Sequence, residues 1–250
     1  MSDPRSTNPY TSSTSAVPGT LPAEQQVGAP PIQVDARTQQ AFLTQAFIWM
    51  FVGLAVTAAI AYIVQSNERL LEFAANNLFV LIIAQLGLVF AIGLGIRRIS
   101  ATVALGLFFV YAASLGITIG LIVTAYTQAS VVSAFLSSSA MFGAAAIYGH
   151  VTKRSLARMG SLLFMGLIGL LVAMVINLFL RSDVASFAIS VIGVIIFTGL
   201  TAWDVQRIQN GQLAVYTGSV EKAAVMGALT LYLDFINLFL FLLRIFGGRN

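Results

Sequence analysis

The sequence contains no cysteine and a single histidine, His150. The absence of cysteine excludes disulfide frameworks, thiolate metal sites and cysteine nucleophiles. One histidine is too few for a metal cage built from imidazole ligands. The sequence therefore predicts no resident cofactor.

Charged residues are also scarce. Asp, Glu, Lys and Arg make up 9% of the chain, against 58% hydrophobic residues, and the mean hydropathy is +0.90. A soluble domain of this length could not hide so much apolar surface in one core, so the composition indicates a polytopic membrane protein in contact with the lipid bilayer. The formal net charge of +4 is small, and no nucleic-acid partner is implied.

Residues 1–38 differ from the rest of the chain. Ser, Thr, Pro, Gln and Gly dominate there, with almost no apolar periodicity, which is typical of disorder. The segment lacks the basic start and apolar core of a cleavable signal peptide. We therefore predict a disordered tail at 1–38 and a membrane domain at 39–250.

Seven apolar runs follow the tail, and runs of about 20 apolar residues are typical of membrane-spanning helices. The fold class predicted is thus all-α. The boundary between the third and fourth runs is the weakest, because only Thr127, Gln128 and Ser130 mark it, and six or eight spans stay open. The runs cover 42–65, 77–96, 101–125, 129–149, 160–180, 185–206 and 223–246.

Basic residues are unevenly divided between the two sides of these spans. Four fall opposite the N-terminal tail, at Arg69, Arg181, Arg244 and Arg249. Nine fall on the side of the tail, at Arg5, Arg37, Arg97, Arg98, Lys153, Arg154, Arg158, Arg207 and Lys222. The positive-inside rule then predicts a cytoplasmic N-terminus.

Two acids lie within the apolar runs. Asp234 is near the midpoint of the last run, where a carboxylate costs about 2.5–3.5 kcal/mol on insertion scales. Asp204 ends the sixth run. Intramembrane acids usually mark a functional site with a partner, and antiparallel packing of the last two helices would bring these two together in the cytoplasmic half.

Each acid lies on the small, polar side of its helix. At 100° per residue Asp204 shares a stripe with Thr201, and Asp234 shares one with Thr230 and Asn237. These three polar residues are candidates for an ion path or for support of the acids.

A basic partner is available where the second run ends, at Arg97 and Arg98. One of these long side chains can point inward toward the acids while the other extends outward to the interface. The alternative is that both only anchor the helix on the cytoplasmic side. The sequence leaves open which arginine contacts the acid pair.

Two carboxylates close together in a medium of low dielectric constant cannot both ionise easily. The pair shares one proton and titrates as a unit. With that proton present, the acids clamp the sixth helix to the seventh; without it, they repel or recruit a cation. Oxygen ligands favour calcium, and Asp204 and Asp234 alone would form a weak, transient calcium site suited to passage.

Several long motifs in the chain resemble the bacterial branch of the Bax inhibitor-1 family, also called the transmembrane Bax inhibitor motif family. The resemblance covers residues 42–247 and implies seven helices, six of them surrounding a central seventh, in the bacterial inner membrane. It also implies a pH-regulated calcium leak. The motifs are YGHVTKRSLARMG (148–160), FMGLIGLLVAMVINLFL (164–180), SVIGVIIFTGLTAWDVQRI (190–208) and LYLDFINLFLFLLRIFG (231–247).

The resemblance also implies roles for single residues. The family's acid pair matches Asp204 and Asp234, and its basic residue at the end of the second helix matches Arg97. Two positions depart from the family: Trp203 and His150 stand where tyrosine is common. His150 is a candidate second pH sensor near neutral pH, or else a solvated loop residue.

Two other functions compete with the leak. An intramembrane aspartyl protease would carry Gly-x-Gly-Asp at its second acid and Pro-Ala-Leu near its C-terminus. Here Asp234 follows Leu231-Tyr232-Leu233, and no proline follows Pro31, so no enzyme is expected. The other is a regulatory protein that binds a membrane quality-control protease, a partner that bacterial members of the resembled family have, with the tail as its handle.

Overall fold

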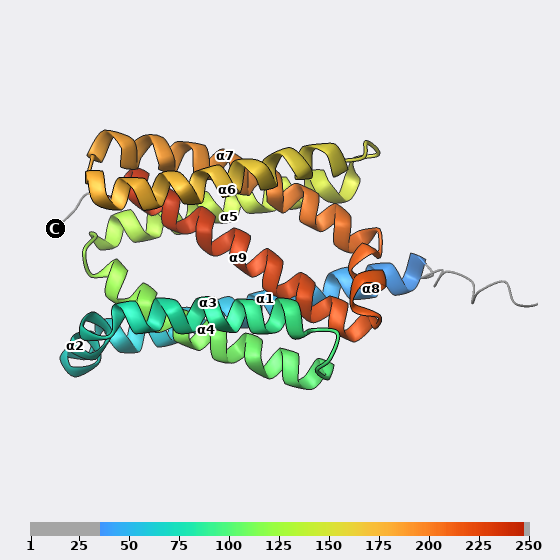
Figure 1. Cartoon of the computed structure of the whole chain (residues 1–250), viewed down its shortest axis with the longest axis horizontal. Coiled ribbons are helices and arrows are strands. Elements are labelled where there is room, and N and C mark those ends of the chain that lie inside the picture. Colours follow the sequence, from blue (N-terminus) through green and yellow to red (C-terminus); the bar gives the residue numbers. More distant parts are fainter. Residues whose placement is uncertain (1–35, 248–250) are drawn as a thin grey trace, which may run out of the picture. The chain divides into compact units, whose positions relative to one another are not determined.

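The computed structural model describes residues 36–247, and every regular element in that range is a helix. Seven of these helices are long and apolar enough to cross a membrane, so the predicted all-α class with seven spans is confirmed (Figure 1). They are α1 (Ala36–Gln65), α3 (Leu78–Gly95), α4 (Ala101–Val123), α5 (Gln128–Val151), α6 (Ala157–Leu180), α7 (Asp183–Gln209) and α9 (Val220–Phe246).

The tail predicted at 1–38 lies outside the described residues except for its last three, which already belong to α1. The expected handle for a protease partner lies outside them as well.

Two short helices that were not predicted lie at opposite ends of the bundle. Helix α2 (Glu68–Asn76) begins where the Asn67 side chain accepts hydrogen bonds from the backbone N–H groups of Arg69 and Leu70. Helix α8 (Gln212–Thr217) lies between Gly211 and Gly218, whose φ angles of 70° and 72° favour glycine. We refer to the α2 end and the α8 end of the bundle (Figure 1).

The weakest predicted boundary, between the third and fourth spans, is a true turn. The Thr127 hydroxyl accepts a hydrogen bond from the backbone N–H of Ser130, which satisfies one of the free donors at the start of α5. Ser100, Ser182 and Ser219 accept equivalent bonds at the starts of α4, α7 and α9. Polar side chains therefore separate spans that composition alone nearly merges.

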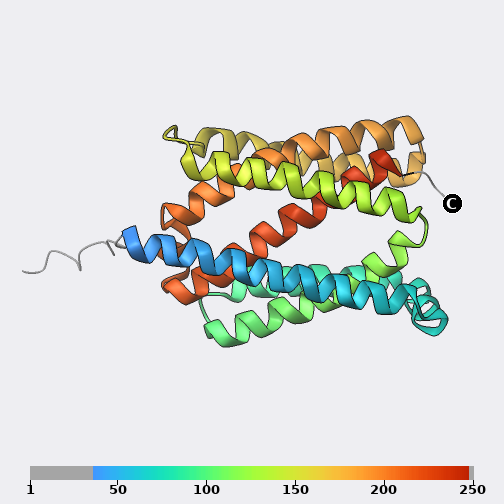
Figure 2. The ribbon, with the colours of Figure 1, turned by 180° about the vertical axis from the view of Figure 1, so that it is seen from behind.

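Helix α9 is the central element. In the most apolar stretch of 18 residues of α9, 72% of the residues are buried, whereas the corresponding values are 11% for α3 and 6% for α6. It packs against α1, α4, α5 and α7, whereas α3 and α6 pack mainly on α4 and α7. Figures 1 and 2 show α9 crossing obliquely between a group of α1, α3 and α4 and a group of α5, α6 and α7.

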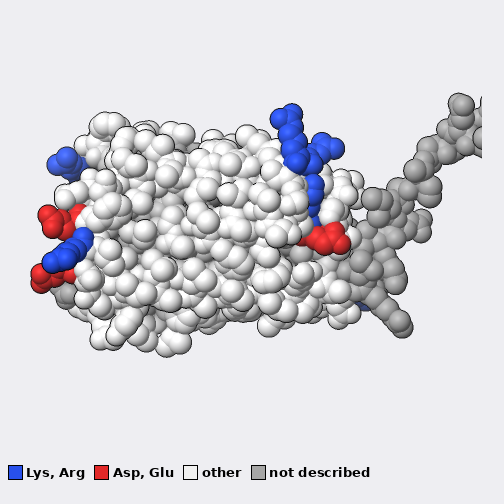
Figure 3. Space-filling model, turned by 90° about the horizontal axis from the view of Figure 1, so that it is seen from below, with Lys and Arg blue, Asp and Glu red and all other residues white. Residues whose placement is uncertain are grey.

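Charged side chains gather at the two ends and leave a broad uncharged belt between them on the face that Figure 3 shows. Large apolar side chains such as Phe79 and Phe179 are exposed, which suits contact with lipid. Among the described residues, the α8 end carries Arg97, Arg98, Lys153, Arg154, Arg158, Arg207 and Lys222, and the α2 end carries Arg69, Arg181 and Arg244.

Small residues allow α1 and α4 to approach closely. A Cβ atom at Gly116 would lie 2.8 Å from both the Ile60 Cβ and the Thr57 carbonyl oxygen, and one at Gly120 would meet Val64 at 2.8 Å. Close helix contact at small residues is a common source of packing energy in membranes. These glycines thus fix the spacing of the two helices.

We expect Gly116→Ala to lower the free energy of unfolding in mixed micelles by about 1–3 kcal/mol, because the added methyl group forces the α1 backbone away. Gly106→Ala is the matched control on the same helix, since a Cβ there meets nothing within 4 Å. It should leave stability unchanged or raise it slightly. Equal losses in both variants would contradict the close packing.

Candidate functional site

The structure brings Asp204 of α7 and Asp234 of α9 together. Their carboxyl groups lie within hydrogen-bonding reach of each other, and the two residues are only 3% and 4% exposed. Asp234 lies at the middle of the most buried helix, and Asp204 lies about one and a half turns before the end of α7. Neighbouring antiparallel helices therefore place two acids from distant parts of the chain in one buried site.

The three polar residues on the acids' stripes are held by their own helices. The Thr201 hydroxyl donates to the Phe197 carbonyl, the Thr230 hydroxyl donates to that of Met226, and the Asn237 amide donates to that of Leu233. Each bond spans one helical turn, and each satisfies a polar group that would otherwise be costly at membrane depth. These bonds run along the residues' own helices, on the side that carries the acids, and do not involve either acid.

Arg207 is the basic residue at the acid pair. Its Nη2 lies 3.2 Å from Asp204 Oδ1, one helical turn away on α7. Its guanidinium carbon also lies 4.7 Å from the centre of the Trp203 ring, which favours a cation there. The indole is in turn fixed against α6, because Gly160 leaves room for it that a Cβ would fill. Arg207 is thus oriented by an acid and an aromatic ring.

Arg97 and Arg98 lie elsewhere. Both side chains are exposed in the turn after α3, and the backbone carbonyl of Arg97 accepts a hydrogen bond from Lys222 Nζ at 3.2 Å. The expected contact of Arg97 with the acids is therefore made in this structure by Arg207, because α7 carries its own cation one turn past Asp204. Residue spacing of i, i+3 could have revealed this partner.

The charges at the site do not balance without a proton. Two ionised carboxylates and one guanidinium would leave a net charge of −1 in a buried position. Asp204 Oδ1 has the guanidinium 3.2 Å away but receives no well-aligned hydrogen bond, Asp234 Oδ2 receives none, and Arg207 Nε has no acceptor. One proton held between the two acids makes the site neutral and supplies a donor to one carboxylate.

The structure shows the limits of the site as a metal centre. Within residues 36–247, no group of three or more His, Cys, Asp and Glu side chains could hold an ion. His150 is exposed at the end of α5 and lines a groove shared with Val205, the neighbour of Asp204. Among the described residues, Asp204 and Asp234 are the only carboxylates that this site offers a calcium ion, which suits weak binding.

The chain is similar to known proteins over most of its length. The family model described as "Inhibitor of apoptosis-promoting Bax1" matches residues 39–250. Inner membrane protein YbhL of Escherichia coli K12 is 44% identical over 217 residues, which cover 84% of this chain and 93% of that protein. A protein of Deinococcus radiodurans is 44% identical over 210 residues, covering 84% and 91% of the two chains. A membrane protein of Streptococcus pyogenes serotype M3 is 41% identical over 214 residues, covering 84% and 93%.

We expect Arg207→Met to lower the free energy of unfolding by about 1–3 kcal/mol at pH 8, because Asp204 loses its cation while still buried. The loss should shrink as the pH falls, since a protonated carboxyl group needs no cation. Adding Asp204→Asn should restore most of the stability. Arg158→Met, at an exposed position on the same side, is the control. A loss that is independent of pH would contradict the ion pair.

Proposed function

Because the chain belongs to the Bax inhibitor-1 family, we propose that it is a multi-pass protein of the bacterial inner membrane that lets calcium leak across in a pH-dependent way. The inner-membrane assignment rests on its similarity to YbhL. The observation that carries the leak is the buried pair of Asp204 and Asp234 between α7 and α9.

We call the proton shared by Asp204 and Asp234 the latch, because it holds α7 against α9. With it, the two carboxyl groups and Arg207 form a neutral cluster, and the carboxyl–carboxyl hydrogen bond holds α7 against α9. When the proton is lost, two like charges face each other at short range, and a divalent cation relieves their repulsion. The clamp is therefore present at low pH and lost as the pH rises, so calcium flux increases with pH.

Arg207 competes with calcium for the same acid. Its side chain is 23% exposed and belongs to the last turn of α7, so it can swing toward the α8 end without crossing the bundle. While it stays on Asp204, it occupies the position that a cation would take. Release of Arg207 and binding of calcium are thus alternative states of one site.

Calcium flux into proteoliposomes tests the latch. Wild-type flux should rise with pH, whereas Asp204→Asn and Asp234→Asn should each stay closed, because an amide donates a hydrogen bond to the remaining acid at every pH. At pH 8 we expect at least about a tenfold reduction, the factor that 1.4 kcal/mol represents. Asp183→Asn, an exposed acid at the start of α7, is the control. Unchanged flux and pH response in both Asn variants would refute the latch.

We also propose that the α8 end faces the cytoplasm, since it carries most of the described basic residues. The chain has no cysteine, so single cysteines can be added without background. Ser66→Cys, exposed beyond α1, should react with a membrane-impermeant maleimide in intact cells. Ser155→Cys, exposed between α5 and α6, should react only after permeabilisation. The reverse pattern would invert the orientation.

A further inference from the structure

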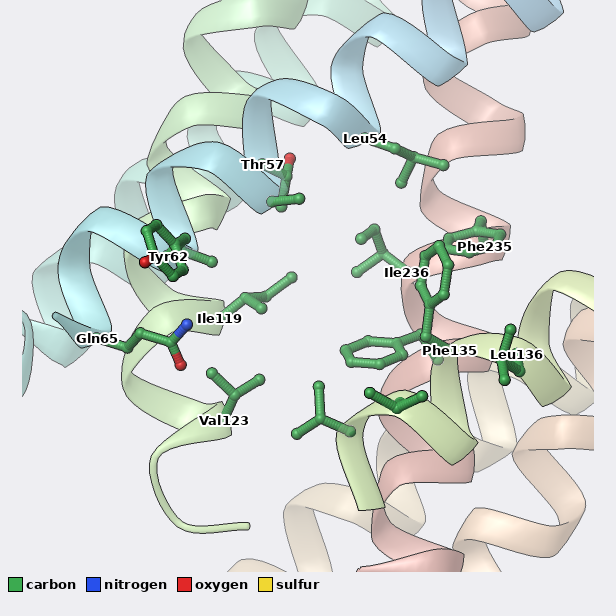
Figure 4. Close-up of a pocket in the computed structure, with 15 residues that line it drawn as sticks. Leu54, Thr57, Tyr62, Gln65, Ile119, Val123, Phe135, Leu136, Phe235 and Ile236 are labelled. Atoms are coloured by element: carbon green, nitrogen blue, oxygen red, sulfur yellow. The ribbon is translucent and has the colours of Figure 1, made fainter. Parts of the chain in front are cut away.

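Two cavities lie along the seam between α1 and α5. The first has a volume of about 310 Å³ and opens in the half of the bundle toward the α2 end, among side chains of α1, α4, α5 and α9 (Figure 4). The second has a volume of about 330 Å³ and lies toward the α8 end, between α1 and α5 with Val205 of α7. They therefore occupy the same seam at different depths.

The seam exists because α1 and α5 belong to different halves of the bundle. Helix α1 packs on α4 and α9, α5 packs on α7 and α9, and α1 and α5 are not closely packed on each other. Figure 2 shows the two helices apart, with α9 visible in the space between them. The seam is thus a weak line in the packing, with α9 as its floor.

Aromatic rings close the seam between the two cavities. Phe47 of α1 meets Phe142 of α5 with ring centres 6.4 Å apart, and Phe142 meets Phe235 of α9 at 5.6 Å. Phe235 also meets Phe135 of α5 at 5.9 Å. We call these four residues the phenyl plug. Phe135 and Phe235 line the α2-end cavity and Phe47 lines the α8-end cavity, so the plug separates one from the other.

Polar side chains accompany both cavities. Gln65 lines the α2-end cavity and Figure 4 shows its amide beside the opening, whereas the hydroxyl of Thr57 is turned away and bonds the Ala112 carbonyl and the Tyr232 hydroxyl. Gln40, Thr44 and His150 line the α8-end cavity. Polar groups on either side of an apolar constriction are what a path for hydrated ions requires, because such a constriction blocks ions by excluding water.

The plug is joined to the acid pair through the backbone. Phe235 follows Asp234 on α9, and Val205, which lines the α8-end cavity, follows Asp204 on α7. A rotation or shift of α9 that separates the acids also changes the position of the Phe235 ring relative to Phe142. No other described charge than Arg207 acts on the acids.

We propose that the seam between α1 and α5 is the path of the leaking ion and that the phenyl plug is its gate, moved by α9 when the acid pair separates. This inference rests on the proposed function and adds to it the route and the barrier. The acids are the sensor beside the route, and the rings are the barrier within it.

Flux measurements with a truncated plug test the barrier. Phe142→Ala removes two ring contacts and should raise calcium flux at pH 6, where the latch is closed, by about tenfold. Phe109→Ala is the matched control, since this ring pairs with Trp49 and Phe108 between α1 and α4, outside the seam and away from the acid pair. Where Phe142→Ala fails to fold, Phe135→Ala opens the plug from a half-exposed position. Equal flux in the plug and control variants would overturn the gate.

Single cysteines test the route independently of flux. Ala58 lines the α2-end cavity and Ala55, one turn earlier on α1, does not, although both are exposed. A water-soluble thiosulfonate should label Ala58→Cys and spare Ala55→Cys. At pH 6, where the latch is closed, Thr44→Cys in the α8-end cavity should become reachable from the α2 side only when Phe142→Ala is added.

The outcomes separate the two proposals. Labelling of Ala58→Cys by a photoactivatable lipid, but not by the water-soluble reagent, would make the cavity a site for an acyl chain and overturn the route. Flux that depends on Asp204 and Asp234 but not on the plug, with no labelling of Thr44→Cys across it, would overturn this inference alone. Absence of flux in the wild type would overturn the proposed function and the inference with it.

Discussion

Two carboxyl groups buried between membrane helices must share a proton or bind a cation, and the packing of α7 on α9 depends on how that requirement is met. Asp204 and Asp234 meet it with one guanidinium, and a single proton makes the cluster neutral. Burial makes the stability of this cluster depend strongly on its net charge, because an uncompensated charge costs several kcal/mol per ion away from water. A change of one proton is therefore large enough to compete with the packing of two helices.

The acid pair lies on the central helix α9, so a change in its protonation acts at the centre of the described bundle. Helix α9 lies between two groups of helices that contact each other less closely than each contacts α9, so a shift of α9 alters both groups at once. The same helix carries Asp234 in the latch, Phe235 in the phenyl plug and Tyr232, whose hydroxyl lies 2.6 Å from the Thr57 hydroxyl of α1. The proposed sensor, the proposed barrier and this contact with α1 thus fall within four consecutive positions of one helix, 232–235.

The sequence predicts the fold well because its composition is strongly apolar and its few charged residues are easily located. Apolar runs indicate seven spans, and an acid inside such a run usually marks a site with a partner, so the sequence predicts Asp204 and Asp234 as a pair. Arg207 was counted only as an orientation signal, although its spacing from Asp204 and Trp203 places all three on one face of α7. The phenyl plug could not be predicted, because its rings come from three helices and are ordinary apolar residues in sequence. The short α2 and α8 were missed because polar loops carry no membrane signal.

Infrared difference spectroscopy across a pH titration tests the central claim most directly. A protonated carboxyl group has a C=O stretching band that the ionised form lacks, so the shared proton is visible. The account predicts a band at low pH that disappears as calcium flux rises, and that is lost or shifted in both Asp204→Asn and Asp234→Asn. A band that is unaffected by either substitution, or flux that rises while the band persists, would contradict a proton-held latch between α7 and α9.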